Sequence, residues 1–120
     1  MICDEATFCV KKAVSDEKDA AIKTHGHFHS HHEAYAVLLE EVEEVTGGAQ
    51  VFTEGAEFQM LQLWQQVRED MQLAGSAKAR LREVKRLALD LAYECVQVAA
   101  MCDKWCLLLE SEAAASEIAK

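Results

Sequence analysis

The sequence contains no proline, and three of its five glycines, Gly47, Gly48 and Gly55, lie close together. Because proline and glycine are the residues that most strongly interrupt helices, their scarcity favours long helical segments. No segment alternates strictly between apolar and polar residues, as a half-buried strand would. The hydrophobic fraction of 51% argues against disorder. We therefore predict an all-α protein with a single domain over residues 1–120.

Positive charge is also scarce, since twelve basic residues face twenty-one acidic ones and the net charge is -9. Such a charge repels nucleic-acid polymers and anionic membranes. No apolar run is long enough to cross a bilayer, and Asp4 and Glu5 interrupt any secretory signal at the N-terminus. We expect a cytoplasmic protein with neither a nucleic-acid polymer nor a membrane as its partner.

The cysteines do not form the close pairs that bind metals or exchange disulfides. There are five of them, and no two have the CxxC spacing. Cys95, Cys102 and Cys106 share one side of a predicted helix, where we interpret them as small core residues. The sequence therefore predicts five free thiols in a reducing compartment.

Apolar periodicity predicts four helices, which we expect to form an antiparallel four-helix bundle. A capping box of Ser30 and Glu33 marks the start of the second helix. Thr46-Gly47-Gly48 is predicted to end it, Ala74-Gly75-Ser76 to form a turn, and residues 113–120 to fray. The expected helices run approximately over residues 4–23, 30–45, 54–73 and 77–112.

All five histidines lie between residues 25 and 32, in the segment HGHFHSHH. Clustered imidazoles can bind Zn²⁺ or Ni²⁺. No cysteine or aspartate has the spacing of a defined site with them, so we interpret the segment as a solvated loop that leads into the second helix. The sequence leaves open whether any of these histidines binds a metal. They are His25, His27, His29, His31 and His32.

Carboxylates interrupt two of the apolar stripes. At about 100° per residue, Glu41 lies near the middle of the stripe of the second helix, and Glu44 lies at its edge. Glu94 is in line with Leu91 and Val98 on the fourth helix, where Asp90 and Gln97 flank it.

A lone ionised carboxylate buried between helices costs several kcal/mol, and two that face each other repel. A buried Arg or Lys, a shared proton or a divalent cation would each resolve the conflict. Oxygen ligands favour Mg²⁺ or Mn²⁺. The alternative is that Glu41 and Glu94 lie at the margin of the bundle and bond to polar neighbours.

Two segments resemble the MazG-like all-α nucleoside triphosphate pyrophosphohydrolases, especially the small phage and prophage type. They are HHEAYAVLLEEVEEV (residues 31–45) and ECVQVAAMCDK (residues 94–104). The family signature is E-E-x-x-E on one helix and E-x-x-D on a later one. Residues 40–44 supply the first motif in full. In the second motif Glu94 is present, but Gln97 replaces the aspartate.

The resemblance implies a Mg²⁺-dependent hydrolase that converts a nucleoside triphosphate to the monophosphate and pyrophosphate. By position, Glu41, Glu44 and Glu94 match the metal ligands, and Glu40 matches an outer acid that binds the ion or positions water. Gln97 holds a ligand position with a neutral amide, which binds Mg²⁺ more weakly than a carboxylate. Asp90, one turn back, could compensate.

Arg86 and Lys104 are candidates for contact with the phosphates, because both lie on the Asp90/Gln97 edge of the fourth helix. Each could instead pair with an acid. The acidic face of one bundle would remain open, so we expect a homo-oligomer, a dimer or a tetramer, with a small nucleotide as ligand. The alternatives are a degenerate member of the fold that binds nucleotide, metal or protein, and a helical adaptor whose acidic face contacts another protein.

Overall fold

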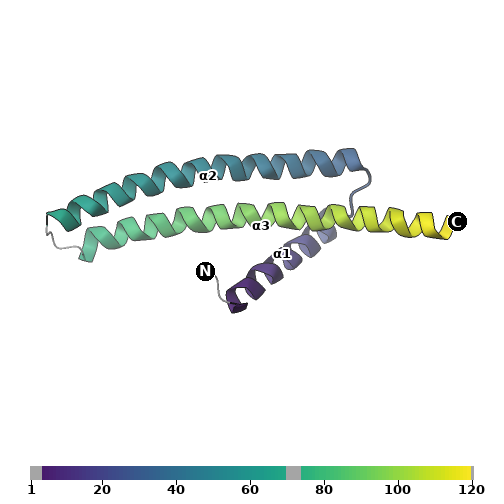
Figure 1. The fold of residues 1–120 in the computed structure, drawn as a ribbon, viewed down its shortest axis with the longest axis horizontal. Coiled ribbons are helices and arrows are strands. Elements are labelled where there is room, and N and C mark those ends of the chain that lie inside the picture. The colour runs from purple at the N-terminus through teal and green to yellow at the C-terminus, as the bar shows by residue number, and fades with distance from the viewer. Residues whose placement is uncertain (1–3, 70–73, 120) are drawn as a thin grey trace. The chain divides into compact units, whose positions relative to one another are not determined.

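The computed structural model describes residues 4–69 and 74–119 and contains three helices over these residues (Figure 1). The helices are α1 (Asp4–His25), α2 (His31–Arg68) and α3 (Ala74–Ala119). The described residues form no strand, so the all-α prediction is confirmed for them. The prediction of four helices is not, because the second and third expected helices form one continuous α2.

The predicted boundaries within α2 and α3 are wrong in four places. Helix α2 continues through Thr46-Gly47-Gly48 instead of ending there, and the expected start at Glu54 lies in its interior. The expected turn at Ala74-Gly75-Ser76 forms the first residues of α3, and residues 113–119 continue that helix. The last residues of the expected third helix, residues 70–73, lie outside the described part of the chain.

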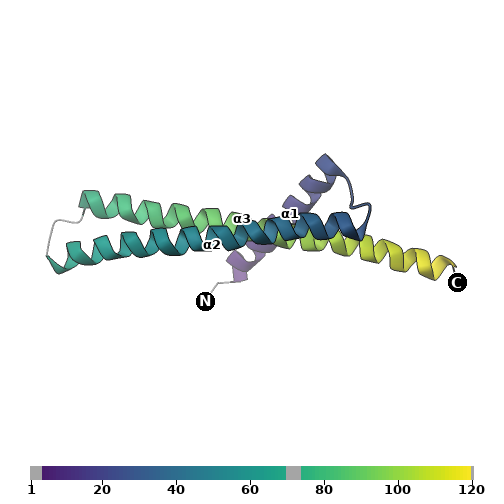
Figure 2. The same cartoon turned by 90° about the horizontal axis from the view of Figure 1, so that it is seen from above.

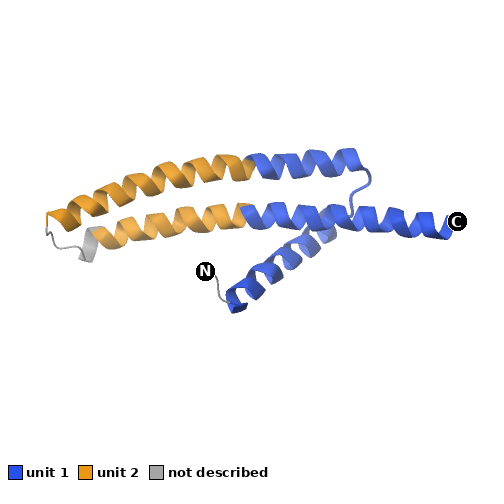
Figure 3. Cartoon of the chain, viewed as in Figure 1, with its two compact units in different colours: residues 1–43, 95–120 blue, residues 44–94 orange. Residues whose placement is uncertain are grey.

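The chain divides into two compact units (Figure 3). Unit 1 comprises residues 1–43 and 95–120, and unit 2 comprises residues 44–94. Helices α2 and α3 pass through both units, whereas α1 belongs to unit 1 alone. The expectation of a single domain stays a prediction.

In unit 1 three helices enclose a small core. Phe28, Ala34, Ala100 and Met101 are its buried members, and Val14, Ala21, Val37, Leu38, Trp105 and Leu108 pack around them. Helix α1 runs obliquely to α2 and α3 (Figures 1 and 2), and it ends where Gly26 adopts a positive φ of 78°. The Gly26 N–H donates to the carbonyl of Ile22 at 2.7 Å, which caps the helix.

The start of α2 is fixed by two sets of hydrogen bonds. The backbone N–H of Glu33 donates to Ser30 Oγ at 3.1 Å, so the predicted cap at Ser30 is formed. Trp105 Nε1 donates to His31 Nδ1 at 2.9 Å. In a neutral imidazole the proton is then on Nε2, which lies 2.8 Å from a carboxylate oxygen of Glu112. The first turn of α2 is thereby attached to α3 within unit 1.

In unit 2, α2 and α3 run antiparallel, and two glycines of α2 allow α3 to approach closely. A Cβ on Gly48 would lie 3.6 Å from Leu91 Cδ1, and one on Gly55 would lie 2.7 Å from Leu87 Cδ1. Glycine inside a helix costs about 1 kcal/mol relative to alanine. Contact with α3 offsets that cost here, which explains why Gly48 does not end the helix.

Much of the apolar surface of unit 2 remains exposed. Leu87 is buried, but more than half of each side chain of Phe58, Trp64 and Leu89 is accessible. Two helices can cover only the seam between them, so side chains pointing away from the seam remain in solvent.

The described residues also test the predictions about membrane-spanning segments and about the cysteines. None of the helices combines the length and apolar character that a bilayer span requires. Cys95, Cys102 and Cys106 are exposed free thiols, so their interpretation as core residues is wrong. Sharing one side of a helix does not by itself bury a residue, because burial also requires a neighbouring element over that side. Cys9 is likewise exposed and free, whereas Cys3 lies outside the described residues.

We expect Gly47→Ala and Gly55→Ala to differ in sign. A Cβ on Gly47 would meet no atom within 4 Å, so its alanine variant should gain about 1 kcal/mol of unfolding free energy from helix propensity. A Cβ on Gly55 would overlap the buried Leu87, and overpacking costs about 1–3 kcal/mol. Urea unfolding curves of the two variants and the wild type measure the difference. Equal gains for both variants would contradict the close packing at Gly55.

Candidate metal centre

Two carboxylates from different helices meet in unit 2. Glu44 projects from α2 and Glu94 from α3, and a carboxylate oxygen of one lies within 4.8 Å of an oxygen of the other. Glu94 is half-buried, whereas Glu44 is exposed. A Cβ on Gly48, one turn after Glu44, would lie 3.9 Å from Glu94 Cγ. Because Gly48 has no side chain, the methylene groups of the Glu94 side chain can lie close to the α2 backbone.

The surroundings of Glu94 raise the pKa of its carboxyl above the ordinary value of 4.5. Partial desolvation is the largest cause, because it penalises the charged form. A hydrogen bond to Glu44 and the negative charges of Glu44 and Asp90 act in the same direction. Near neutral pH, the facing acids therefore destabilise one another in the absence of a cation.

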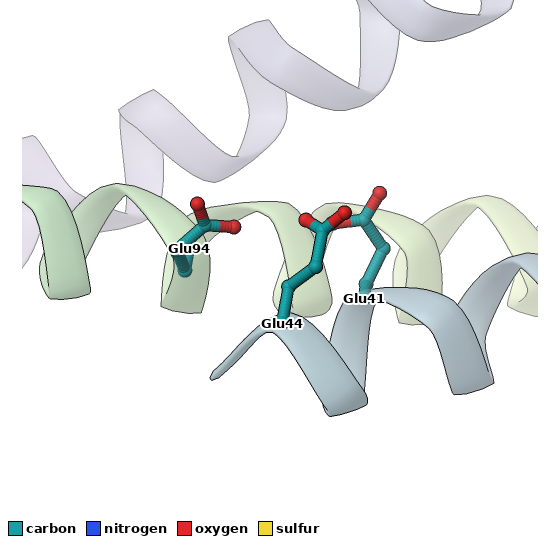
Figure 4. A group of neighbouring side chains, drawn as sticks. All are labelled: Glu41, Glu44 and Glu94. Atoms are coloured by element: carbon teal, nitrogen blue, oxygen red, sulfur yellow. The ribbon is translucent and has the colours of Figure 1, made fainter. Parts of the chain in front are cut away.

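Glu41 supplies a third carboxylate one turn before Glu44 on α2. Residues three apart are neighbours on a helix surface, and Figure 4 shows the Glu41 and Glu44 side chains rising from the same side of α2. The half-buried Glu41 belongs to unit 1, where it also lines a cavity. Within unit 2, the carboxylate neighbour of Glu44 is Glu94 on α3.

The other acidic candidates are less enclosed. Glu40 is exposed on α2, about 100° around the helix from Glu41. Asp90 is exposed on α3 and accepts a hydrogen bond from Arg86 Nη1 at 2.9 Å. Arg86 also donates to Glu83 at 2.6 Å. Arg86 therefore forms two ion pairs within its own helix, which is the alternative to a phosphate contact that the sequence left open.

Gln97 and Lys104 lie in unit 1, on the part of α3 that faces the cavity containing Glu41. The Gln97 side chain is half-buried, and its Nε2 has no hydrogen-bond partner among the described residues. Lys104 is buried, with its Nζ 4.1 Å from the centre of the Phe28 ring. Sequence reasoning did not identify Phe28. Its position as the one apolar residue within the histidine segment was the available signal.

Comparisons with known proteins add no assignment, because no family model, curated protein or solved structure matches the chain.

The raised pKa of Glu94 predicts a pH-dependent effect of Glu94→Gln. An acid with a raised folded-state pKa destabilises the fold while it is ionised, and the penalty disappears as pH falls through the folded value towards 4.5. In metal-free buffer the variant should therefore melt higher than the wild type at pH 7, and the gap should close on acidification. Exposed Glu57→Gln on α2 is the control and should show little change at either pH. A lower melting temperature for Glu94→Gln at pH 7 would mean that the carboxylate is stabilised where it lies.

Proposed function

We propose that Glu44 and Glu94, with Glu41 as a third ligand, bind a divalent cation, Mg²⁺ or Mn²⁺, and that the protein hydrolyses nucleoside triphosphates to monophosphates and pyrophosphate. The observation that carries the proposal is the close approach of the Glu44 and Glu94 carboxylates across two helices. A cation between them would convert their repulsion into attraction. The donors are all oxygens, the ligands that hard cations prefer. The resemblance of residues 31–45 and 94–104 to the MazG-like motifs supports the same chemistry.

In this proposal the protein residues bind the ion and orient water. Glu41, Glu44 and Glu94 hold the cation, and Glu40, exposed beside Glu41, orients the attacking water. When bound, the cation supplies charge stabilisation to the phosphoryl oxygens. With Arg86 engaged by Glu83 and Asp90, the ion provides most of the positive charge that the triphosphate requires.

A binding module without turnover is the second candidate, and Gln97 is the observation that favours it. The amide cannot act as a base, and it binds Mg²⁺ less strongly than the aspartate of the family signature. Asp90 accepts a bond from Arg86, so it would have to leave that ion pair to compensate. In this alternative the fold binds metal or nucleotide but does not release pyrophosphate.

We expect Mn²⁺ or Mg²⁺ to raise the melting temperature of the wild type, because an ion that binds only the folded state stabilises it. Glu41→Gln, Glu44→Gln and Glu94→Gln should each reduce that increase and abolish turnover. Glu43→Gln, within the same acidic segment, is the matched control and should behave like the wild type. Gln97→Asp restores the E-x-x-D pattern and should strengthen the response to the ion. The measurements are thermal melts with and without Mn²⁺ and pyrophosphate release from a panel of triphosphates.

The outcomes separate the candidates. Ion-dependent melting together with pyrophosphate release supports the hydrolase. Ion-dependent melting without release from any triphosphate supports the binding module. If millimolar Mn²⁺ moves none of the melts, the cation site is wrong and both candidates fall with it.

We also propose that the chain forms a homo-oligomer in which two α2–α3 pairs complete a four-helix arrangement. The exposed Phe58, Leu61 and Trp64 on α2 of unit 2 support this, since aromatic side chains are enriched at interfaces. The wild type should sediment as a dimer or tetramer, and Trp64→Glu should shift it towards monomer by placing a charge in the contact. Ile118→Glu, at a highly exposed site near the end of α3, is the control. A monomeric wild type in analytical ultracentrifugation would contradict the proposal.

A further inference from the structure

Unit 1 contains a cavity of about 510 Å³ between its three helices. This volume lies within the range of small-molecule sites. Ala21, Val37 and Met101 contribute apolar walls, and polar side chains from all three helices line the remainder. The metal ligands proposed above do not account for most of this lining, because only Glu41 is common to both.

Lys104 is the most unusual residue of the lining. It is only 5% exposed, and its ammonium group lies over the Phe28 ring at 4.1 Å. In the described part of the chain no carboxylate lies within 4.0 Å of Nζ. A buried cation normally requires a partner, and the face of one ring replaces only part of its hydration. The ammonium therefore has N–H donors available for a ligand.

Gln97 provides a second available donor in the same lining. Its Nε2 is shielded from solvent, and no acceptor lies within hydrogen-bond distance of it in residues 4–69 and 74–119. A buried donor without an acceptor costs about 1–3 kcal/mol, and a ligand acceptor would remove that cost. Lys104 and Gln97 thus place two donors on one face of α3, and a ligand that carries acceptors could pair with both.

The charge of the cavity distinguishes between possible acceptors. Glu17, Glu33 and Glu41 line it as well, so three carboxylates oppose one ammonium group. A phosphate would be repelled by the three acids, although Lys104 alone would attract it. A neutral group with carbonyl oxygens would accept from Lys104 and Gln97 without that repulsion.

We propose that this cavity binds the base of the nucleotide, and that Lys104 and Gln97 select bases that carry a carbonyl oxygen opposite their donors. The inference rests on the proposed function and adds a substrate class to it. Hypoxanthine, guanine, uracil and thymine offer such oxygens, whereas adenine has none. A site built around hydrogen bonds rejects an analogue that lacks the acceptor, because its polar groups then stay unpaired.

The test uses nucleosides without metal, so that its result does not depend on the cation site. Inosine and adenosine are nearly equal in size and differ chiefly in the carbonyl or amino group at one ring position. Calorimetric or ligand-observed NMR titration of the full chain in EDTA should show inosine and uridine binding more tightly than adenosine. Lys104→Met should weaken inosine binding about tenfold or more, the loss expected for a hydrogen bond from a charged group.

Gln97→Leu provides a second variant that does not alter the charge, and it should weaken inosine binding in the same way. Lys85→Met, at an exposed position of α3, is the matched control and should leave binding unchanged. Circular dichroism melts establish that each variant is folded before its titration.

Three results would overturn the inference: no nucleoside binding to the folded wild type, equal binding of inosine and adenosine, or inosine binding that survives both substitutions. Binding of inorganic tripolyphosphate that depends on Lys104 would instead identify an anion site. Each of these outcomes is distinct from failure of the proposed hydrolase, which would appear as melts and pyrophosphate release that do not respond to Mn²⁺.

Discussion

The close approach of α2 and α3 at Gly48 and Gly55 is the contact on which the rest of unit 2 depends. Leu87 and Leu91 pack where the α2 helix has no side chain, and Leu87 becomes one of the few buried residues of the unit. The same approach brings Glu94 against Gly48 and opposite Glu44. Packing energy at the glycines thus holds two acids together that would otherwise separate. A helix pair with larger residues at these positions would relax both the seam and the carboxylate pair.

Periodicity and capping chemistry predicted the helical character and the start of α2, because both are determined by residues within one or two turns. Ser30 and Glu33 are such a case. Gly47 and Gly48 are the opposite case. Glycine is as suitable for ending a helix as for admitting a neighbouring one, and the choice depends on Leu91, more than forty positions along the chain. No local pattern contains that information.

The candidate site likewise contains residues that the local sequence could identify and residues whose surroundings depend on distant parts of the chain. Glu41, Glu44 and Glu94 could be identified because a carboxylate in an apolar stripe conflicts with its surroundings, and that conflict is visible in the sequence. Lys104 was assigned to the edge of its helix, yet it is buried against Phe28. A helix wheel describes one helix against one partner. In unit 1 a third helix and the loop before α2 cover the edge, and their positions follow from tertiary packing alone.

The hydrogen bonds of His31 also determine what the histidine segment is able to bind. A metal ion requires a ring nitrogen with a free lone pair. On His31, Nδ1 accepts the indole proton of Trp105, and Nε2 faces Glu112. Coordination at this residue would require the ion to displace one of these partners and to loosen the first turn of α2. Among the five histidines, His31 thus has a structural role, and any metal capture by the segment depends on the imidazoles that precede or follow it.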